Sequence, residues 1–381
     1  MRLVFLGDLS ASGIFGQKMK MGRPILSDDI KENLIKADHV HVNLENPITD
    51  APFRPDKKGA ALRAPAELTD FLVDSRISIC DLANNHIMDC GENGIRDTLE
   101  DLEKSGISYY GVSGHPYLIA EGDGVRVALI ASAHKEGPMA SACELGPLHL
   151  SLQETTELIR EMRITEGADF IIYNFHGGTE FNLVPEPERR LFFHHLLGCG
   201  VDVIVGHHAH VPQGYEQLNK GIIFYGLGNF VFDIPYHREK AFTDVSLLLE
   251  LVFEAGRRIR YRRSYNAIDR QTGITTPLGQ ERETLRKHIE TGTSVFRTED
   301  EYKKAWLDEA FRVYLFNTPT RAYGSGRHTD SLPLDPSLSN HLLTWARLAK
   351  RAPRDLMRAH KRPFLLASFR RMLKYGLSNE M

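Results

Sequence analysis

The chain has 381 residues, of which 42% are hydrophobic and 25% are charged, a composition that supports one large domain or one domain plus a smaller unit. Its formal net charge of −3 excludes a global positive field that would draw the chain to nucleic acid or to a membrane surface. Its apolar runs are too short to span a bilayer and its N-terminus lacks the pattern of a signal peptide, so we expect a cytoplasmic protein.

Over the first 235 residues, short apolar segments alternate with amphipathic ones, which predicts an α/β fold. Strands are expected at 2–6, 40–44, 77–82, 107–110, 125–132, 170–175, 201–205 and 222–225. Helices are expected at 28–37, 65–74, 91–105, 153–166 and 187–197.

The second part of the chain has a different pattern. Residues 245–254 and 258–265 are expected to form an antiparallel hairpin that turns near Ala255 and Gly256. Helices are expected at 280–290, 298–316, 336–350 and 363–375. We therefore predict a domain over residues 1–270 and a helical C-terminal extension over residues 271–381.

The extension is basic at its end. Residues 345–381 contain ten Lys or Arg and two Asp or Glu, whereas the rest of the chain has 37 basic and 48 acidic residues. Such a segment can dock on anionic lipid or nucleic acid, but a solvated helix face that packs on the body of the protein is the commoner case. We expect no nucleic-acid partner.

Polar residues of metal-ligand type follow the carboxyl ends of five predicted strands, and these residues are Asp8, Glu45, Asn85, His176 and His208. In open α/β sheets, ligands bind outside the carboxyl ends of the strands. A single Asp or Glu at a strand end is more often a turn former or a cap than a ligand. The five together, at one edge, predict a binding site.

The strongest local signal is the sequence Gly206-His207-His208-Ala209-His210. The His-x-His spacing would place two imidazoles on the same side of an extended segment, and imidazole is the commonest metal-binding side chain. A pair of structural histidines is the alternative. Carboxylates, imidazoles and an amide oxygen together suit Mn, Fe or Zn, and two such ions can activate a water and clamp a phosphoryl group.

Six motifs occur in order along residues 3–253: GDLS at 7–10, NLENP at 43–47, LANNHIMDCG at 82–91, NFHGGTEF at 174–181, GHHAHVPQG at 206–214 and YGLGNFVFD at 225–233. This series resembles the calcineurin-like metallophosphoesterase superfamily, and more closely its CapA/PgsA-type branch of capsule and poly-γ-glutamate synthesis proteins. The resemblance implies a four-layer α/β/β/α sandwich with two divalent metal ions at the strand ends.

The resemblance also implies roles for individual residues. The first metal would be held by Asp8 and His210, the second by Asn85, His176 and His208, and Glu45 would bridge the two. His86 would protonate the leaving oxygen and Asp89 would orient it. The candidates for substrate contact are Arg63, Glu180, His207 and Asn229. This chain has Ser10 where metallophosphatases at large have a first-motif histidine.

Three functions remain open from the sequence. The first is a metal-dependent hydrolase of a phosphoester, linked to capsule, polyglutamate or polysaccharide biosynthesis. The second is a metal-dependent amide hydrolase or transferase that acts on poly-γ-glutamate. The third is a non-catalytic accessory subunit of a polymer synthase. The expected partners are a small-molecule or polymer substrate and a polymer-synthase complex.

Overall fold

The structure, a computed structural model, describes residues 1–57, 59–134, 145–218, 221–279 and 282–316. The chain divides into two units, Met1–Thr293 and Ser294–Met381. The first unit continues past the predicted boundary at residue 270, because β14 (Ile274–Pro277) pairs with β13 (Arg258–Asp269) and because α8 (Arg282–Ser294) contributes two side chains to the core. In the second unit, the described part consists chiefly of α9 (Glu299–Phe316).

Two mixed β-sheets lie at the centre of the first unit. The larger sheet has the order β14-β13-β12-β1-β2-β3-β4, and β11 pairs with β1 off this path. Its other strands are β1 (Arg2–Leu9), β2 (His39–Leu44), β3 (Ile79–Asp81), β4 (Ser108–Tyr110), β11 (Asn229–Val231) and β12 (Val245–Glu254).

The smaller sheet has the order β5-β6-β7-β8-β10-β9. Its strands are β5 (Tyr117–Gly122), β6 (Val125–Ala133), β7 (Phe170–His176), β8 (Val203–His207), β9 (Tyr215–Leu218) and β10 (Gly221–Phe224). The strands β6, β7, β8 and β10 are parallel, and β5 and β9 pair antiparallel at the two edges.

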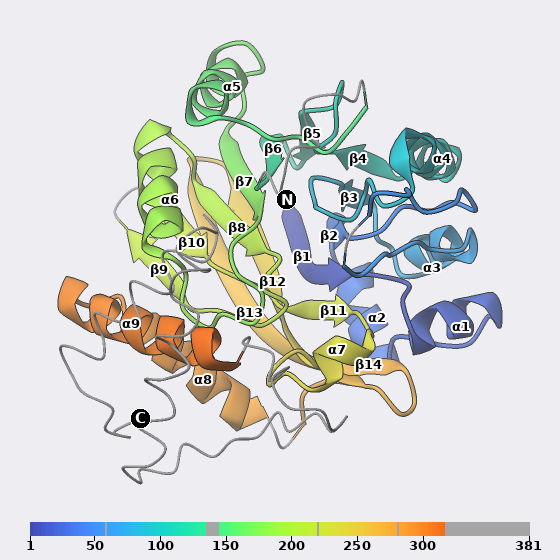
Figure 1. Cartoon of the computed structure of the whole chain (residues 1–381). Coiled ribbons are helices and arrows are strands. Elements are labelled where there is room, and N and C mark those ends of the chain that lie inside the picture. The colour runs from blue at the N-terminus through green and yellow to red at the C-terminus, as the bar shows by residue number, and fades with distance from the viewer. Residues whose placement is uncertain (58, 135–144, 219–220, 280–281, 317–381) are drawn as a thin grey trace, which may run out of the picture. The chain divides into compact units, whose positions relative to one another are not determined.

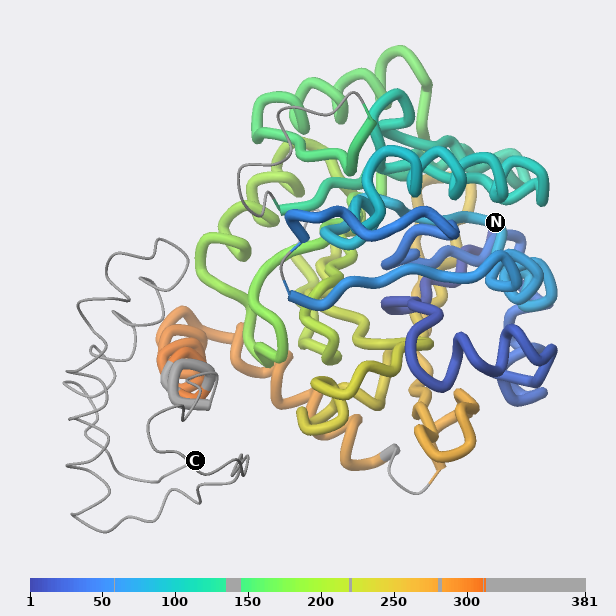
Figure 2. Tube along the Cα trace, turned by 45° about the vertical axis from the view of Figure 1, so that its right-hand side comes forward, coloured from blue at the N-terminus to red at the C-terminus, as the bar shows by residue number. Residues whose placement is uncertain are grey.

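Helices lie on the outer side of each sheet (Figure 1). Beside the larger sheet are α1 (Ile14–Lys20), α2 (Asp28–Ile35), α3 (Glu67–Asp74) and α4 (Gly91–Lys104). Beside the smaller sheet are α5 (Leu152–Ile164) and α6 (Pro187–Cys199). The Cα trace in Figure 2 likewise separates the blue N-terminal segments on the right from the green segments at the top and left. A short helix, α7 (Pro235–Arg238), follows β11.

The side chains of β1 show why the sheets stack in this way. Leu3 and Phe5 belong to the core between the two sheets, whereas Val4 and Leu6 belong to the core under α1–α4. Alternate residues of a strand face opposite sides of a sheet, so a strand buried on both faces is apolar throughout. On the other side, Phe175 of β7 packs against Phe193 of α6, with ring centroids 5.4 Å apart. The predicted four-layer α/β/β/α sandwich is confirmed.

The predicted strands and helices of the first 316 residues are present with shifted ends, and the hairpin turns where predicted, with Gly256 at a φ of 84°. The sequence pattern did not predict α1, α7, β5, β9, β11 and β14, which are short or lie at edges. The helices predicted at 336–350 and 363–375 and the basic segment 345–381 lie outside the described residues. Within the described residues, no helix is long and apolar enough to cross a membrane.

Candidate metal centre

The predicted ligands come from the carboxyl ends of parallel strands in both sheets. In the larger sheet, β1, β2 and β3 run parallel, with Asp8 on β1 and Glu45 directly after β2. In the smaller sheet, β7 and β8 run parallel, and their last residues, His176 and His207, are paired. Because the carboxyl ends of parallel strands meet at one edge, the two stacked sheets bring these side chains together.

A close backbone approach places a further strand beside Asp8. The strand β11 runs parallel to β1 with Asn229 opposite Asp8, and the Asp8 amide donates to the carbonyl oxygen of Gly228 at 2.9 Å. A Cβ atom on Gly7 would lie 1.9 Å from that carbonyl oxygen. Only glycine is compatible with this contact at position 7.

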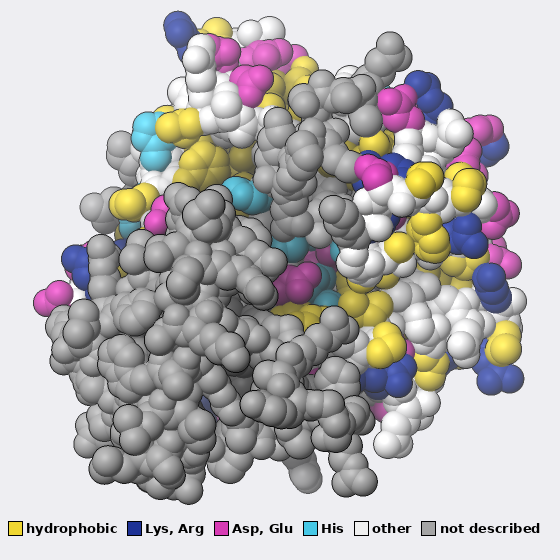
Figure 3. Space-filling view, viewed as in Figure 1, with side chains coloured by type: hydrophobic (Ala, Val, Ile, Leu, Met, Phe, Trp, Pro, Cys, Tyr) yellow, Lys and Arg dark blue, Asp and Glu magenta, His cyan; other side chains and the backbone are white. Residues whose placement is uncertain are grey.

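Five of the six predicted metal ligands form two overlapping groups around Glu45. Donor atoms of Glu45, His208 and His210 lie within 4.8 Å of one another, and so do donor atoms of Asp8, Glu45 and His176. All five side chains are buried. On the face shown in Figure 3, acidic and histidine side chains gather in a central hollow. The division of ligands between two ions stays a prediction, since these groups differ from the pairing that the sequence implied.

Glu45 is the centre of this cluster and is fully buried, yet neither of its carboxylate oxygens has a hydrogen-bond partner among the residues that the structure describes. Its Oε1 lies 3.6 Å from His176 Nε2 and 3.6 Å from His210 Nε2. Burial holds the pKa of Glu45 well above its ordinary value, against the opposing effect of His210. A buried carboxylate without donors is unfavourable unless a cation compensates it.

Asp8 differs from Glu45 because hydrogen bonds satisfy its carboxylate. Its Oδ1 accepts from Asn43 Nδ2 at 2.8 Å and lies 3.0 Å from His207 Nδ1. Its Oδ2 lies 3.3 Å from His210 Nδ1 and accepts from the His208 amide at 3.3 Å. Burial alone would raise the pKa of Asp8, but the hydrogen bonds with His207 and His210 outweigh it and hold that pKa well below its ordinary value.

The orientation of His210 follows from its contact with Asn229. The ring nitrogen Nδ1 lies 2.9 Å from Asn229 Oδ1, and Asn229 Nδ2 donates to the carbonyl oxygen of Thr243 at 2.9 Å, which fixes the amide. His210 Nδ1 therefore donates, and Nε2 faces Glu45. Burial lowers the pKa of His210, but the charges of Glu45 and Asp8 prevail and raise it to about 10.

On the other side of the cluster, His176 Nε2 lies between two further predicted ligands. It is 2.9 Å from Asn85 Oδ1 and 3.1 Å from His208 Nδ1. Burial, together with the nearby His208, holds the pKa of His176 well below its ordinary value, so this ring is neutral near pH 7. A neutral imidazole beside an amide oxygen is a suitable donor pair for a borderline divalent ion.

The His-x-His segment is not extended, contrary to the sequence prediction. The strand β8 ends at His207, and His208 and His210 have φ angles of 82° and 57°. Residues other than glycine adopt this left-handed region at a cost of about 1–3 kcal/mol each, and such residues concentrate at functional sites. The turn nevertheless directs both rings towards Glu45.

The predicted general acid, His86, lies outside the two donor groups and forms its own cluster. Its Nδ1 is 2.8 Å from Asp89 Oδ2, and the catalytic roles of both residues stay predictions. Lys57 was not predicted, because it lies in a loop with no recognisable pattern. Its ammonium pairs with Asp89 Oδ1 and lies 3.4 Å from His86 Nδ1. Asn84 fixes this turn, since its Oδ1 accepts from the His86 amide at 3.1 Å.

The four candidates for substrate contact lie in different surroundings. His207 and Asn229 are buried against Asp8 and His210, as described above. Glu180 is half-buried, and its charge contributes to raising the pKa values of Glu45 and His210. Arg63 is exposed and donates to the carbonyl oxygen of Ala51 at 3.0 Å.

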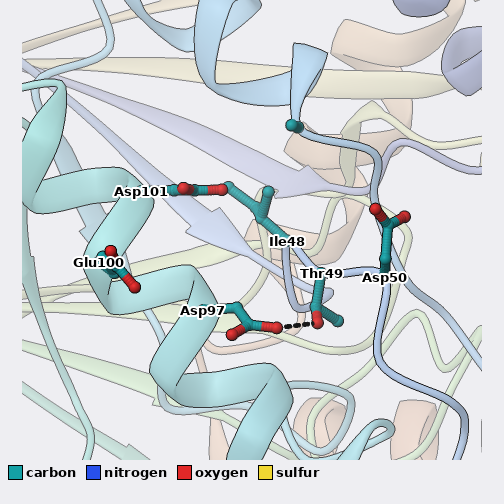
Figure 4. A pocket seen from close by; sticks show the side chains of 7 residues that line it. Ile48, Thr49, Asp50, Asp97, Glu100 and Asp101 are labelled. Carbon is teal, nitrogen blue, oxygen red and sulfur yellow. Dashed lines mark hydrogen bonds between the residues drawn. The ribbon is translucent and has the colours of Figure 1, made fainter.

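A separate acidic depression of about 240 Å³ lies beside α4 (Figure 4). It is lined by Ile48, Thr49, Asp50, Ala66, Asp97, Glu100 and Asp101. Thr49 Oγ1 donates to Asp97 in this depression. None of the predicted site residues lines it, so the chemistry predicted from the sequence does not extend there.

The donor set fits a divalent metal ion. Two carboxylates and three imidazoles converge, and the orphaned oxygens of Glu45 have no other partner among the described residues. The separation of 3.6 Å between Glu45 Oε1 and each of two ring nitrogens suits ligands that share one ion at about 2.0–2.2 Å. Asn43 and Asn229, which hold Asp8 and His210, are the supporting contacts that metal ligands require.

A family model described as bacterial capsule synthesis protein PGA_cap matches residues 2–234. The capsule biosynthesis protein CapA of Bacillus anthracis is 30% identical over 219 residues, which are 54% of this chain and 53% of that protein. A probable polyglutamine synthesis accessory protein of Mycobacterium tuberculosis is 29% identical over 214 residues, which are 50% of this chain and 55% of that protein. The chain spans about half the length of these relatives.

Among solved structures, a phosphatase of Mycoplasma pneumoniae aligns with a TM-score of 0.44 and 17% sequence identity. The alignment covers 71% of this chain and 96% of that chain. The family match includes every predicted site residue, from Asp8 to Asn229.

The orphaned carboxylate of Glu45 predicts opposite effects of Glu45→Gln with and without metal. Folding raises the pKa of Glu45, so this group makes the folded protein less stable as the pH rises above the ordinary pKa of 4.5. In chelator at pH 7, the variant should therefore be more stable than wild type by about 1–3 kcal/mol, and the difference should shrink towards pH 4.5. Added Mn²⁺ or Zn²⁺ should raise the Tm of wild type and leave that of the variant unchanged. Thermal unfolding measures both effects.

Glu216→Gln is a matched control, because Glu216 is also buried but accepts hydrogen bonds from Arg190 and Tyr225. Burial raises the pKa of Glu216, but its hydrogen bonds prevail and lower it to about 2. At pH 7, the Glu216→Gln control should be less stable than wild type. Its Tm should still rise when metal is added. A Glu45→Gln variant that gains as much from metal as wild type would contradict the assignment.

Proposed function

The chain belongs to the bacterial capsule synthesis protein family PGA_cap, and on that premise we propose that it is a metal-dependent hydrolase of phosphoesters that serves capsule or poly-γ-glutamate biosynthesis. The observation that carries the proposal is the convergence of the Asp8 carboxylate and three imidazoles on the orphaned carboxylate of Glu45. This donor set suits two divalent ions such as Mn, Fe or Zn.

In the proposed site, Asp8 and His210 would hold a first ion, and Asn85, His176 and His208 would hold a second. Glu45 would contribute to both. When bound, such a pair supplies Lewis acidity and a stronger nucleophile at neutral pH. With Ser10 in place of a histidine, the first ion has fewer protein ligands than the second.

Residues behind the ligands keep them in place. His207 and Asn43 hold the Asp8 carboxylate from the interior, and Asn229 holds the His210 ring. Because His207 is only 2% exposed and its Nδ1 faces Asp8, we propose a positioning role for it. Of the candidates for substrate contact, Glu180 and Arg63 remain proposals, since both are accessible to solvent.

Proton transfer is proposed to involve His86. Its Nδ1 faces Asp89 Oδ2 at 2.8 Å, which fixes the tautomer and leaves Nε2 to deliver a proton to the leaving oxygen. Lys57 pairs with the other oxygen of Asp89 and so holds the carboxylate in the orientation that His86 requires. The dyad is buried, with Asp89 1% exposed, so its geometry is constrained by packing.

A second candidate is a non-catalytic accessory role in polymer synthesis, which the name of the Mycobacterium tuberculosis relative favours. A third candidate is hydrolysis of an amide in poly-γ-glutamate, since a water activated by metal ions can attack a carbonyl carbon as well as a phosphorus atom. Release of glutamate oligomers from the polymer would identify the amide hydrolase. Retention of polymer synthesis in cells that carry Asp8→Asn would identify the accessory role.

The phosphoesterase proposal predicts that the ligand variants lose activity. With bis-(p-nitrophenyl) phosphate and Mn²⁺, Asp8→Asn and His208→Ala should each be slower than wild type by about 100-fold or more, because several kcal/mol of transition-state stabilisation is lost. Release of p-nitrophenolate gives the rate. Asp101→Asn, at a half-buried position, and His195→Ala, at an exposed position, make the same chemical changes outside the predicted metal centre and should keep the wild-type rate. Equal residual rates in all five proteins would refute the proposal.

The role of His86 as general acid predicts an effect that depends on the leaving group. For a diester with a poor alkoxide leaving group, His86→Gln should lower kcat by about 10²–10⁴-fold. For p-nitrophenolate, which leaves without a proton, the loss should be much smaller. Steady-state rates on both substrates test this. An equal loss on the two substrates would show that His86 acts in some other way.

A further inference from the structure

One buried arginine connects the segments that carry the three histidine ligands. Arg189 lies in the first turn of α6 and is 6% exposed. Arginine side chains are almost never fully buried unless they are paired, because burial of an unpaired charge is costly. The partners of Arg189 therefore indicate what its charge is used for.

These partners belong to two separate loops. Arg189 Nη1 donates to the carbonyl oxygen of Gly177 at 3.1 Å, and Nη2 donates to Gln213 Oε1 at 2.8 Å. Gly177 directly follows His176, and Gln213 is the third residue after His210. One planar guanidinium thus spans the loop after β7 and the segment after β8.

The partners of Arg189 are themselves fixed. Gln213 Nε2 donates to the carbonyl oxygen of Asn182 at 2.5 Å, and the Gln213 amide donates to the carbonyl oxygen of Gly226 at 3.0 Å. Glu186 Oε2 pairs with Arg189 Nε at 3.2 Å, while Glu186 Oε1 accepts from the Thr179 amide at 2.8 Å. The guanidinium is therefore the centre of a buried polar network between the two loops.

The two loops need this support because their backbones are strained. His208 and His210 have left-handed φ angles, as does Phe181, with a φ of 60°. The Phe181 amide donates to the carbonyl oxygen of Ala209 at 2.8 Å, so the strained parts of the two loops are directly linked. Each such residue persists only when surrounding contacts determine its conformation. Arg189 supplies contacts on both sides of that link.

We propose that Arg189 is a positioning residue of the metal centre, whose guanidinium holds the segments that carry His176, His208 and His210 at the separation that metal binding requires. This inference rests on the proposed metal-binding function of the same site. It extends that function to a residue that contacts none of the donor atoms. Lysine at this position keeps the charge but loses the planar set of donors that reaches both loops.

The test compares Arg189→Lys and Arg189→Met with Arg190→Met. Arg190 is the next residue of α6 and is also paired with a buried carboxylate, because its Nε and Nη2 donate to Glu216 at 2.9 and 3.1 Å. The control therefore removes an equivalent ion pair that does not touch the loops carrying the ligands. Zn²⁺ affinity is measured by competition with a chelator, and the Tm of each protein is measured in EDTA.

Both Arg189 variants should bind Zn²⁺ about 10–100-fold more weakly than wild type, the range seen when contacts behind metal ligands are lost. Arg190→Met should lower the Tm and keep the wild-type affinity. With Co²⁺ bound, Arg189→Lys should also change the visible absorption bands, which report ligand geometry and which a purely structural loss would not move.

Unchanged affinity and an unchanged Co²⁺ spectrum in Arg189→Lys would overturn the inference and leave the proposed function intact. An equal loss of affinity in Arg190→Met would overturn it as well, since general destabilisation would then explain the effect. If wild type itself binds no Zn²⁺, Co²⁺ or Mn²⁺, the proposed function and this inference both fail.

Discussion

The site is organised around one unfavourable feature, the fully buried carboxylate of Glu45, whose oxygens have no hydrogen-bond donor in the described part of the chain. The neighbouring carboxylate of Asp8 is satisfied, by contrast, through its contacts to Asn43 and His207. Burial raises the pKa of Glu45, and the charges of Glu45 and Asp8 outweigh the effect of burial on His210 and raise its pKa. The arrangement is explained if the groups around Glu45 are selected for binding a cation and not for stability.

Other parts of the fold offset the free-energy cost of burying the carboxylate of Glu45. Four layers bury both faces of β1 and surround the strand ends with close-packed apolar side chains. The close approach of Gly7 to Gly228 places β11 against Asp8, and the network at Arg189 fixes the loops whose residues His208 and His210 have strained backbones. Stability gained in the core thus allows a site that is locally unfavourable.

The sequence predicted the fold class and the convergence of Asp8, Glu45 and the histidines because both depend on local patterns. Apolar strands that end in polar residues are visible in a single sequence, and the edge at which parallel strands end is set by topology. The conformation of His208–His210 was predicted wrongly, because an extended segment and a left-handed turn can both bring two imidazoles together. Lys57 and Arg189 were missed, because their partners are distant in sequence and follow from tertiary packing alone.

The central claim, that residues around Glu45 bind divalent metal ions, is tested most directly by elemental analysis. The protein is purified without chelator, reconstituted with Mn²⁺, Zn²⁺ or Fe²⁺, freed of unbound metal and analysed for its metal-to-protein ratio. The account predicts a ratio between one and two for wild type, with the second value reached at higher metal concentration because the first ion has fewer ligands. A ratio near zero with all three metals would contradict it.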